Sequence, residues 1–373
     1  MTTTKYLTKI EQIPEFGDEE RVVLKKVAEK FAFRTNKYYM SLIGWDDPND
    51  PIRRIVIPDA EELDDWGSMD ASNERTYTVA HGLQHKYGST AVLLVTDVCG
   101  GYCRFCFRKR LFTNGHDEIS RDVTDGIQYI RLHDELTNVL VTGGDPLMLS
   151  TNKLEKIIQQ LREIDHVQII RIGTKMLAFN PHRVVNDHAL LEMVQKYSTD
   201  EKKIYIMTQF NHPRELTNVS IEAINSLLGA GAVIANQTPV IRGVNDDPKT
   251  LSALFKKLSF VGATPYYVFQ CRPTSGNKTF AVPVEETYNI FQQALKDCSG
   301  LAKRARLIMS HSTGKIEIVG LTDEHIFFRY HQSTDPEQIG SFMVFKRNSD
   351  AYWFDDYRDP VAKYPDSRSA SNM

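Results

Sequence analysis

The chain has 373 residues and carries 45 Lys and Arg against 48 Asp and Glu, so its net charge at pH 7 is only −3. This balance excludes the strongly basic field with which nucleic-acid-binding and anionic-membrane-binding proteins attract their partners. The first residues lack the apolar core of a signal peptide, and no apolar run approaches the length of a membrane span. We therefore expect a cytoplasmic protein without nucleic-acid or membrane partners.

Three parts are predicted along the chain: a helical N-terminal extension over residues 1–85, a barrel over 86–298 and a mixed C-terminal extension over 299–373. In the first part, apolar residues recur at roughly helical spacing between Asp18 and Lys37, and a loop rich in Asp and Pro follows. We expect this part to cover one end of the barrel core.

From Ala91 onward, six short apolar runs alternate with amphipathic segments. They read as strands: AVLLVT at 91, NVLVT at 138, VQIIRIGT at 167, KIYIMTQF at 203, AVIAN at 232 and TPYYVFQ at 264. Runs that are apolar on both faces favour parallel strands with helical crossovers, in a barrel or in an open doubly wound sheet. Polar residues recur where the runs end, the edge at which barrel enzymes build their sites, so an α/β fold with a partial (β/α)6 TIM-like barrel is preferred.

Three cysteines crowd into the loop after the first run: Cys99, Cys103 and Cys106, in CGGYCRFC. This CxxxCxxC spacing supplies three thiolates to a [4Fe-4S] cluster that needs four ligands, so one iron keeps an open coordination position. A structural zinc site normally requires a fourth Cys or His at short spacing. Incidental buried cysteines are the alternative, but these are usually scattered singly. The remaining two, Cys271 and Cys298, are not expected to form a disulfide.

Polar residues and glycines also follow the later runs. Arg108, Lys109 and Arg110 place cations directly after the cysteines, where an anionic ligand could be held. The second run ends in TGGDP, whose glycines allow close backbone approach and whose carboxylate accepts hydrogen bonds. The next runs lead into Arg171, Lys175, Gln209, His212, Asn236, Gln237, Arg242 and Asn245. Each could be a structural loop group, but their recurrence favours a shared site.

At these segments the chain resembles the radical S-adenosylmethionine enzymes, and within them the lysine 2,3-aminomutase branch. The resemblance runs from about residue 45 to 345 and rests on the cysteine spacing followed by RKR, on DPIRRIVIP at 50–58, and on the order of the GGDP, TQFNHP and NQTPVIRGVND segments. It implies a barrel of the radical S-adenosylmethionine type. The open iron of the cluster would bind S-adenosylmethionine, and one electron, from a donor such as flavodoxin or ferredoxin, would cleave it to a 5′-deoxyadenosyl radical.

The resemblance further implies which residues contact S-adenosylmethionine. In that family a turn that matches Gly143, Gly144 and Asp145 holds the amino group, and the arginine two residues after the last cysteine, here Arg108, faces the carboxylate. We expect additional cofactor contacts from Arg171 and Lys175. The family's ligand-contacting positions are occupied by Gln209, His212 and Gln237, with Gln209 in place of the more usual histidine.

Aminomutases of this branch also use pyridoxal phosphate, held at rest by a Schiff-base lysine. Lys315, in HSTGKIEIVG, matches the context of that lysine, although STG replaces the family's run of glycines; a surface lysine that opens a strand is the alternative. Lys86 and Tyr87, in HKYGST, match a cation and a ring of the cofactor site, but Thr90 replaces a second arginine. This loss would cost about one to two decades in affinity unless another group, such as Arg329, compensates.

The substrate pocket differs from that of the lysine-specific members, which place an aspartate after a QC dipeptide to pair with the distant ammonium of lysine. Here Arg272 follows Gln270 and Cys271, and a guanidinium repels an ammonium and attracts a carboxylate. The second lysine-recognising aspartate is missing from residues 308–311. We expect an amino-acid substrate with an acidic or polar side chain, such as glutamate; alternatively, Arg272 pairs with a structural carboxylate.

Two classes of function follow. The first is a pyridoxal phosphate-dependent amino-acid 2,3-aminomutase, an isomerase that works through the adenosyl radical. The second is a radical enzyme on the same scaffold that abstracts hydrogen without pyridoxal phosphate, for a dehydrogenation, an epimerisation or another small-molecule modification. The family's C-terminal zinc-binding cysteines are absent, because no cysteine follows Cys298, so a metal-clamped dimer is not expected; a homo-oligomer of another kind stays open.

Overall fold

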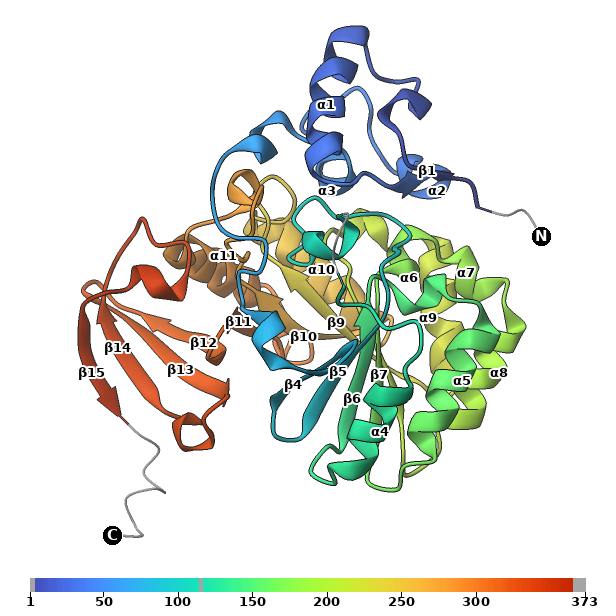
Figure 1. Ribbon diagram of the computed structural model, residues 1–373. Coiled ribbons are helices and arrows are strands. Elements are labelled where there is room, and N and C mark those ends of the chain that lie inside the picture. The colour runs from blue at the N-terminus through green and yellow to red at the C-terminus, as the bar shows by residue number, and fades with distance from the viewer. Residues whose placement is uncertain (1–3, 114–116, 365–373) are drawn as a thin grey trace, which may run out of the picture.

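The computed structural model describes residues 4–113 and 117–364, so residues 1–3 and 365–373 of the two predicted extensions lie outside the described residues. A 13-stranded sheet dominates the fold, with its strands adjacent in chain order from β3 to β15 (Figure 1). A small sheet near the N-terminus pairs β1 (Tyr6–Leu7) with β2 (Thr35–Asn36). Among the described helices, none has the length and apolar character needed to span a membrane.

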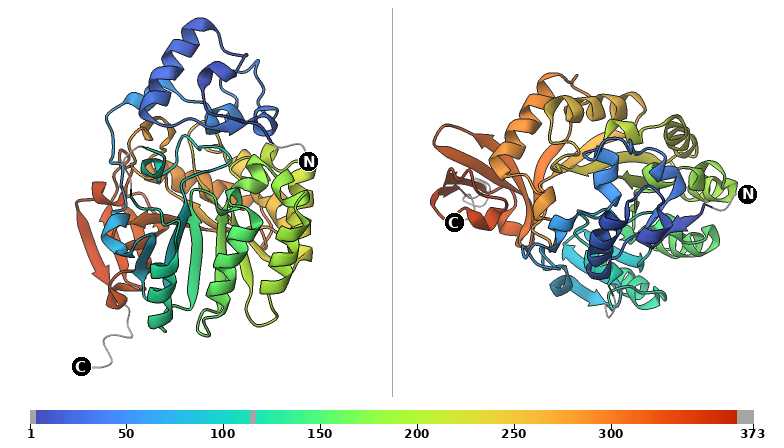
Figure 2. Two further views of the ribbon diagram at one scale, coloured as in Figure 1. Left: turned by 45° about the vertical axis from the view of Figure 1, so that its right-hand side comes forward. Right: turned by 90° about the horizontal axis from the view of Figure 1, so that it is seen from above.

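Six parallel strands form the centre of the large sheet, and each corresponds to one of the predicted runs: β5 (Thr90–Thr96), β6 (Asn138–Gly143), β7 (Ile169–Thr174), β8 (Ile204–Thr208), β9 (Val233–Pro239) and β10 (Thr264–Phe269). Helices connect them: α4 (Thr124–Leu132), α5 (Thr151–Arg162), α6 (Met176–Phe179), α7 (His182–Val185), α8 (His188–Tyr197), α9 (Asn218–Gly229) and α10 (Pro248–Phe260), with α11 (Val284–Lys296) after the last strand. Seen from above, these helices form an arc outside the strands (Figure 2). The predicted partial barrel is confirmed.

Side-chain caps determine where several crossover helices begin. Asp187 accepts a hydrogen bond from the backbone of Leu190 at 3.0 Å before α8, and Asp247 accepts one from Thr250 at 2.8 Å before α10. Such caps satisfy backbone donors of the first helical turn, which have no partner within the helix. Each helix then buries its apolar face against the sheet, which leaves the ends of the strands free for polar side chains.

Antiparallel strands extend the barrel on both sides. On one edge, β3 (Thr78–Ala80) and β4 (Leu83–Tyr87) pair antiparallel ahead of β5. On the other, β11 (Arg306–His311) is parallel to β10, and the antiparallel strands that follow are β12 (Gly314–Leu321), β13 (His325–Ser333), β14 (Phe342–Lys346) and β15 (Pro360–Tyr364). The sheet is continuous across residues 85 and 298, and residue 85 lies within β4, so neither predicted boundary coincides with a break in the sheet.

The N-terminal extension covers the carboxyl ends of the barrel strands (Figure 1). Its helices are α1 (Asp18–Lys30), α2 (Lys37–Met40) and α3 (Pro51–Val56). Helix α1 begins where the helical spacing was predicted to begin, but it ends at Lys30, before the predicted limit at Lys37. Its apolar residues share one buried cluster with Phe105, Phe179 and Cys271 from the barrel end. The extension also bonds the cysteine loop directly, since the Arg34 carbonyl accepts from the backbone of Tyr102 at 2.9 Å and Asn36 donates to the Gly100 carbonyl at 3.1 Å.

Candidate active site

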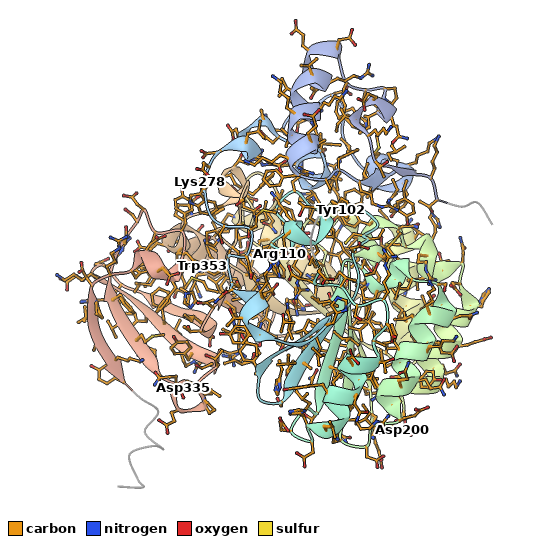
Figure 3. The ribbon with its side chains drawn as sticks, in the orientation of Figure 1. Tyr102, Arg110, Asp200, Lys278, Asp335 and Trp353 are labelled. Carbon is orange, nitrogen blue, oxygen red and sulfur yellow. The ribbon has the colours of Figure 1, made fainter. Side chains whose placement is uncertain are left out.

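The cysteine loop follows β5 and turns back beneath the N-terminal extension. Its shape requires glycine, because a Cβ on Gly100 would lie 2.4 Å from the sulfur of Met176 and one on Gly101 would lie 3.0 Å from the ring of Phe179. Figure 3 labels Tyr102, within this loop, and Arg110, just after it, in the middle of the molecule. All three predicted cluster cysteines, Cys99, Cys103 and Cys106, line one cavity of about 390 Å³.

The GGD turn after β6 packs against the start of this loop. Gly143 has a φ of 122°, and a Cβ on Gly144 would lie 2.6 Å from the carbonyl oxygen of Val98. The backbone of Asp145 donates to that same carbonyl at 2.9 Å, while its carboxylate accepts hydrogen bonds from Thr174 Oγ1 and from backbone N–H groups. The two glycines therefore bring the turn to the cysteine loop, and the aspartate side chain organises the turn itself.

The same cavity collects nearly all residues predicted for cofactor and substrate binding. Besides the cysteines and the GGD turn, its lining includes Lys86, Tyr87, Arg108, Arg171, Lys175, Gln209, Gln237, Arg272 and Lys315. The cysteine loop, the GGD turn, Lys175 and Gln209 come from the carboxyl ends of parallel strands, which meet at a common edge. Lys86, Arg171, Gln237 and Lys315 lie within strands, so the cavity extends from that edge into the barrel. Asn236 and Asn245, by contrast, use their side-chain amides on nearby backbone groups, and Arg242 forms ion pairs with Asp246 and Glu286.

His212, which is predicted as a ligand contact, is not among the residues that line this cavity. Strand β8 ends at Thr208, and the chain continues until His212 caps a 3-10 helix by accepting a hydrogen bond from the backbone of Arg214 at 3.2 Å. Lys175 does line the cavity, but its Nζ is held by Glu215 at 2.7 Å and by Asn211 at 2.7 Å. These contacts give Lys175 a structural role at the cavity wall.

Glu74 is the main polar residue of the cavity that the sequence did not single out. Its carboxylate lies 3.2 Å from Arg108, 2.8 Å from Arg110 and 3.6 Å from Arg272. These guanidinium groups hold the pKa of Glu74 well below its usual range, against the effect of burial. Glu74 begins a short 3-10 helix ahead of the barrel, so no periodicity or strand end pointed to it.

Arg272 has donors that no described residue uses. Its guanidinium stacks on the ring of Phe107 at 3.7 Å and is the most distant of the three from Glu74, and its N–H groups donate no hydrogen bond to a described residue. Arg108 is held more firmly, because it also donates to Thr142 at 3.4 Å. The pairing of Arg272 with a carboxylate is thus present, as in the alternative interpretation, but it leaves hydrogen-bonding capacity at the cavity surface.

Lys315 lies among aromatic rings, with its Nζ 6.0 Å from the ring centroid of Tyr87, 5.2 Å from that of Tyr267 and 5.4 Å from that of Phe269. Burial, together with the positive charges of Arg272, Arg171 and Lys86, lowers the pKa of Lys315 to about 7. A substantial fraction of this amine is therefore uncharged near neutral pH, which a nucleophilic lysine requires.

The residues present match the cofactors that the sequence implied. Three thiolates from one loop suit a cluster with one open iron, and the excess of cations over carboxylates suits anionic groups in the same cavity. A lysine with a pKa of about 7 that lies among aromatic rings suits a cofactor that carries both an aldehyde and a flat ring. Arg329 does not contribute, because it pairs with Glu317.

Comparisons with known proteins agree with this site. The radical SAM superfamily profile matches residues 93–254. The chain is 60% identical over 366 residues to a putative L-lysine 2,3-aminomutase of Aquifex aeolicus, covering 98% of each chain. It is 37% identical over 291 residues to an L-lysine 2,3-aminomutase of Clostridium subterminale (77% of this chain, 68% of the relative) and 35% identical over 286 residues to a glutamate 2,3-aminomutase of Clostridioides difficile (76% and 66%). The chain therefore belongs to the lysine 2,3-aminomutase family of radical S-adenosylmethionine enzymes, which implies a [4Fe-4S] cluster and S-adenosylmethionine as cofactors.

Proposed function

We propose that the protein is a pyridoxal phosphate-dependent amino-acid 2,3-aminomutase whose substrate has an acidic or polar side chain, with glutamate the preferred candidate. The observation that carries this proposal is the near-neutral Lys315 amine in the same cavity as Cys99, Cys103 and Cys106. When bound, S-adenosylmethionine supplies the radical that abstracts a hydrogen atom, and pyridoxal phosphate carries the amino group that moves to the neighbouring carbon.

Different groups of residues in the cavity would bind and orient the cluster, S-adenosylmethionine and pyridoxal phosphate. The cysteine loop would hold the cluster, while Arg108 and the GGD turn would hold S-adenosylmethionine beside it. Lys315 would hold pyridoxal phosphate, with the ring of Tyr87 next to its Nζ. The N-terminal extension covers this end of the barrel, and such a cover keeps water away from reactive species.

Arg272 supports a substrate with an anionic or neutral polar side chain. The guanidinium of Arg272 has N–H donors that no described residue uses. Its one carboxylate partner, Glu74, also forms ion pairs with Arg108 and Arg110, so the charge of Arg272 is only partly compensated. Lysine would bring its ammonium toward this cation, which is unfavourable. Ser310, which also lines the cavity, is a neutral hydrogen-bonding group within residues 308–311, the stretch from which the second lysine-recognising aspartate is missing.

The proposal is tested with reconstituted enzyme, reduced by dithionite or flavodoxin and incubated anaerobically with S-adenosylmethionine and separate amino acids. We expect 5′-deoxyadenosine together with a β-amino acid from glutamate, and far less product from lysine. Preferred turnover of lysine would overturn the substrate assignment. Full activity in protein free of pyridoxal phosphate would instead support the enzyme class that abstracts hydrogen without it.

Replacing Arg272 with Gln is expected to raise the KM for glutamate by about 10- to 100-fold, because a charge-assisted contact to the substrate is lost. Glu74 keeps Arg108 and Arg110 as partners in this variant, so the iron content should stay unchanged. Arg272→Lys should recover part of the affinity, and Lys278→Gln in the same loop serves as the control. An unchanged KM for glutamate in Arg272→Gln would contradict the assigned role.

The low pKa of Lys315 predicts how uptake of pyridoxal phosphate depends on pH. At a pKa of about 7, the uncharged amine rises from about 10% at pH 6 to about 90% at pH 8. The rate of uptake by apoprotein, followed by absorbance, should therefore increase across this interval and level off above it. A rate that continues to rise toward pH 10 would indicate an ordinary lysine pKa instead.

A further inference from the structure

Three cations in the cavity lack a carboxylate partner among the described residues. Arg171 on β7 donates its Nε to Asn138 at 2.8 Å, while its two terminal nitrogens make no hydrogen bond or ion pair with a described residue. Lys86 donates to the backbone carbonyl of His311 at 2.6 Å. The Nζ of Lys315 lies near three aromatic rings and forms no ion pair with a described residue. Uncompensated charge in an enclosed site is costly, and an anionic ligand removes that cost.

The other cations of this region each have a carboxylate partner, although three arginines share Glu74. Arg108 and Arg272 share Glu74, Lys175 pairs with Glu215, and Arg104 pairs with Glu62. Arg171 is therefore the one arginine of the described cavity lining without a carboxylate partner. Its unused nitrogens form a planar fork, the arrangement that binds two oxygens of one phosphate.

Strand register gives this arginine its neighbours. Thr90 on β5 lies opposite Asn138 on β6, and the Asn138 side chain reaches Arg171 on β7. Thr90 and Asn138 are the first residues of β5 and β6, and Arg171 is the third residue of β7. The cysteine loop follows the last residue of β5, so the group formed by Thr90, Asn138 and Arg171 lies toward the opposite end of the strands from that loop. All three residues line the cavity, and the positive charge of Arg171 helps to lower the pKa of Lys315.

We propose that Arg171, oriented by Asn138, binds the phosphate group of pyridoxal phosphate, with the Thr90 hydroxyl as a further donor. This anchor takes over the role of the arginine that is absent at position 90. The inference rests on the proposed function, because it assigns one end of the cofactor that Lys315 holds at the other. A carboxylate of the amino-acid substrate has similar charge, and the experiment separates the two ligands.

The test compares the affinities of apoprotein for pyridoxal phosphate and for pyridoxal, which lacks the phosphate, by absorbance titration. We expect Arg171→Gln to weaken binding of pyridoxal phosphate by about 10- to 100-fold and to leave binding of pyridoxal within about twofold. Arg171→Lys should lose less affinity for pyridoxal phosphate than Arg171→Gln. Arg329→Gln, which alters an arginine paired with Glu317, is the control and should change neither affinity.

A second variant tests whether misfolding explains the weaker binding in Arg171→Gln, because a misfolded protein would not regain affinity for pyridoxal phosphate. Thr90→Arg, added to Arg171→Gln, should restore tighter binding of pyridoxal phosphate without changing that of pyridoxal. Two results would overturn the phosphate assignment while the proposed function stands. In the first, Arg171→Gln weakens the binding of pyridoxal phosphate and of pyridoxal equally. In the second, it changes neither affinity but raises the KM for the amino acid. If the wild-type protein binds neither compound, the proposed function and this inference fail together.

Discussion

Lys315→Ala is expected to abolish the visible absorbance of bound pyridoxal phosphate and to lower aminomutase activity by on the order of 10²- to 10⁴-fold. The physical reason is that burial and neighbouring cations lower the pKa of Lys315 to about 7, so a large fraction of its amine is uncharged near neutral pH. The measurement is an absorbance spectrum of purified protein, followed by product analysis with glutamate. Borohydride treatment and mass spectrometry should locate the label on Lys315 in the wild type.

Controls separate this role from loss of the fold. The iron content and the 5′-deoxyadenosine formed without substrate should be retained in Lys315→Ala, because the cysteine loop lies on another part of the barrel. Lys346→Ala, which removes an exposed strand lysine, should keep both the spectrum and the activity. A Lys315→Ala protein with the wild-type spectrum would show that a different lysine holds the cofactor.

Glu62→Gln is expected to lower the free energy of unfolding by about 3–5 kcal/mol. The Glu62 carboxylate is fully buried and binds Arg104 through two hydrogen bonds of 2.8 Å, and Lys109 lies 3.4 Å away. The neutral amide leaves two buried cations without their counter-ion. Denaturant unfolding of the wild type and the variant measures the difference.

The same variant should also bind less iron, because Arg104 and Lys109 flank Cys106 and their partner anchors the cysteine loop to the N-terminal extension. Glu61→Gln, at the exposed neighbouring position, is the matched control and should change stability by less than about 0.5 kcal/mol. An unfolding midpoint shared by Glu62→Gln and the wild type would mean that this buried bridge contributes nothing to stability.

Local patterns predicted the barrel and much of its chemistry. The six apolar runs became β5 to β10 because a strand buried on both faces needs a continuous apolar sequence, a property visible without the fold. The cysteine spacing and the turn before Lys315 were equally local. The exact path of the chain after a strand was not predictable in this way: the chain runs four residues past β8 before a 3-10 helix begins, and His212 is not part of the cavity lining.

Residue type and short spacing were enough to predict the strands of the barrel and the three thiolates. The family resemblance added the expectation of an aspartate where this chain has Arg272. Which charges are compensated became visible only from the packing of the folded chain. Glu74 reaches Arg108 and Arg272 from a segment far from both in sequence, while Arg171 meets no carboxylate among the described residues. Ion pairing acts over a few ångströms, so it depends on how distant segments are packed together.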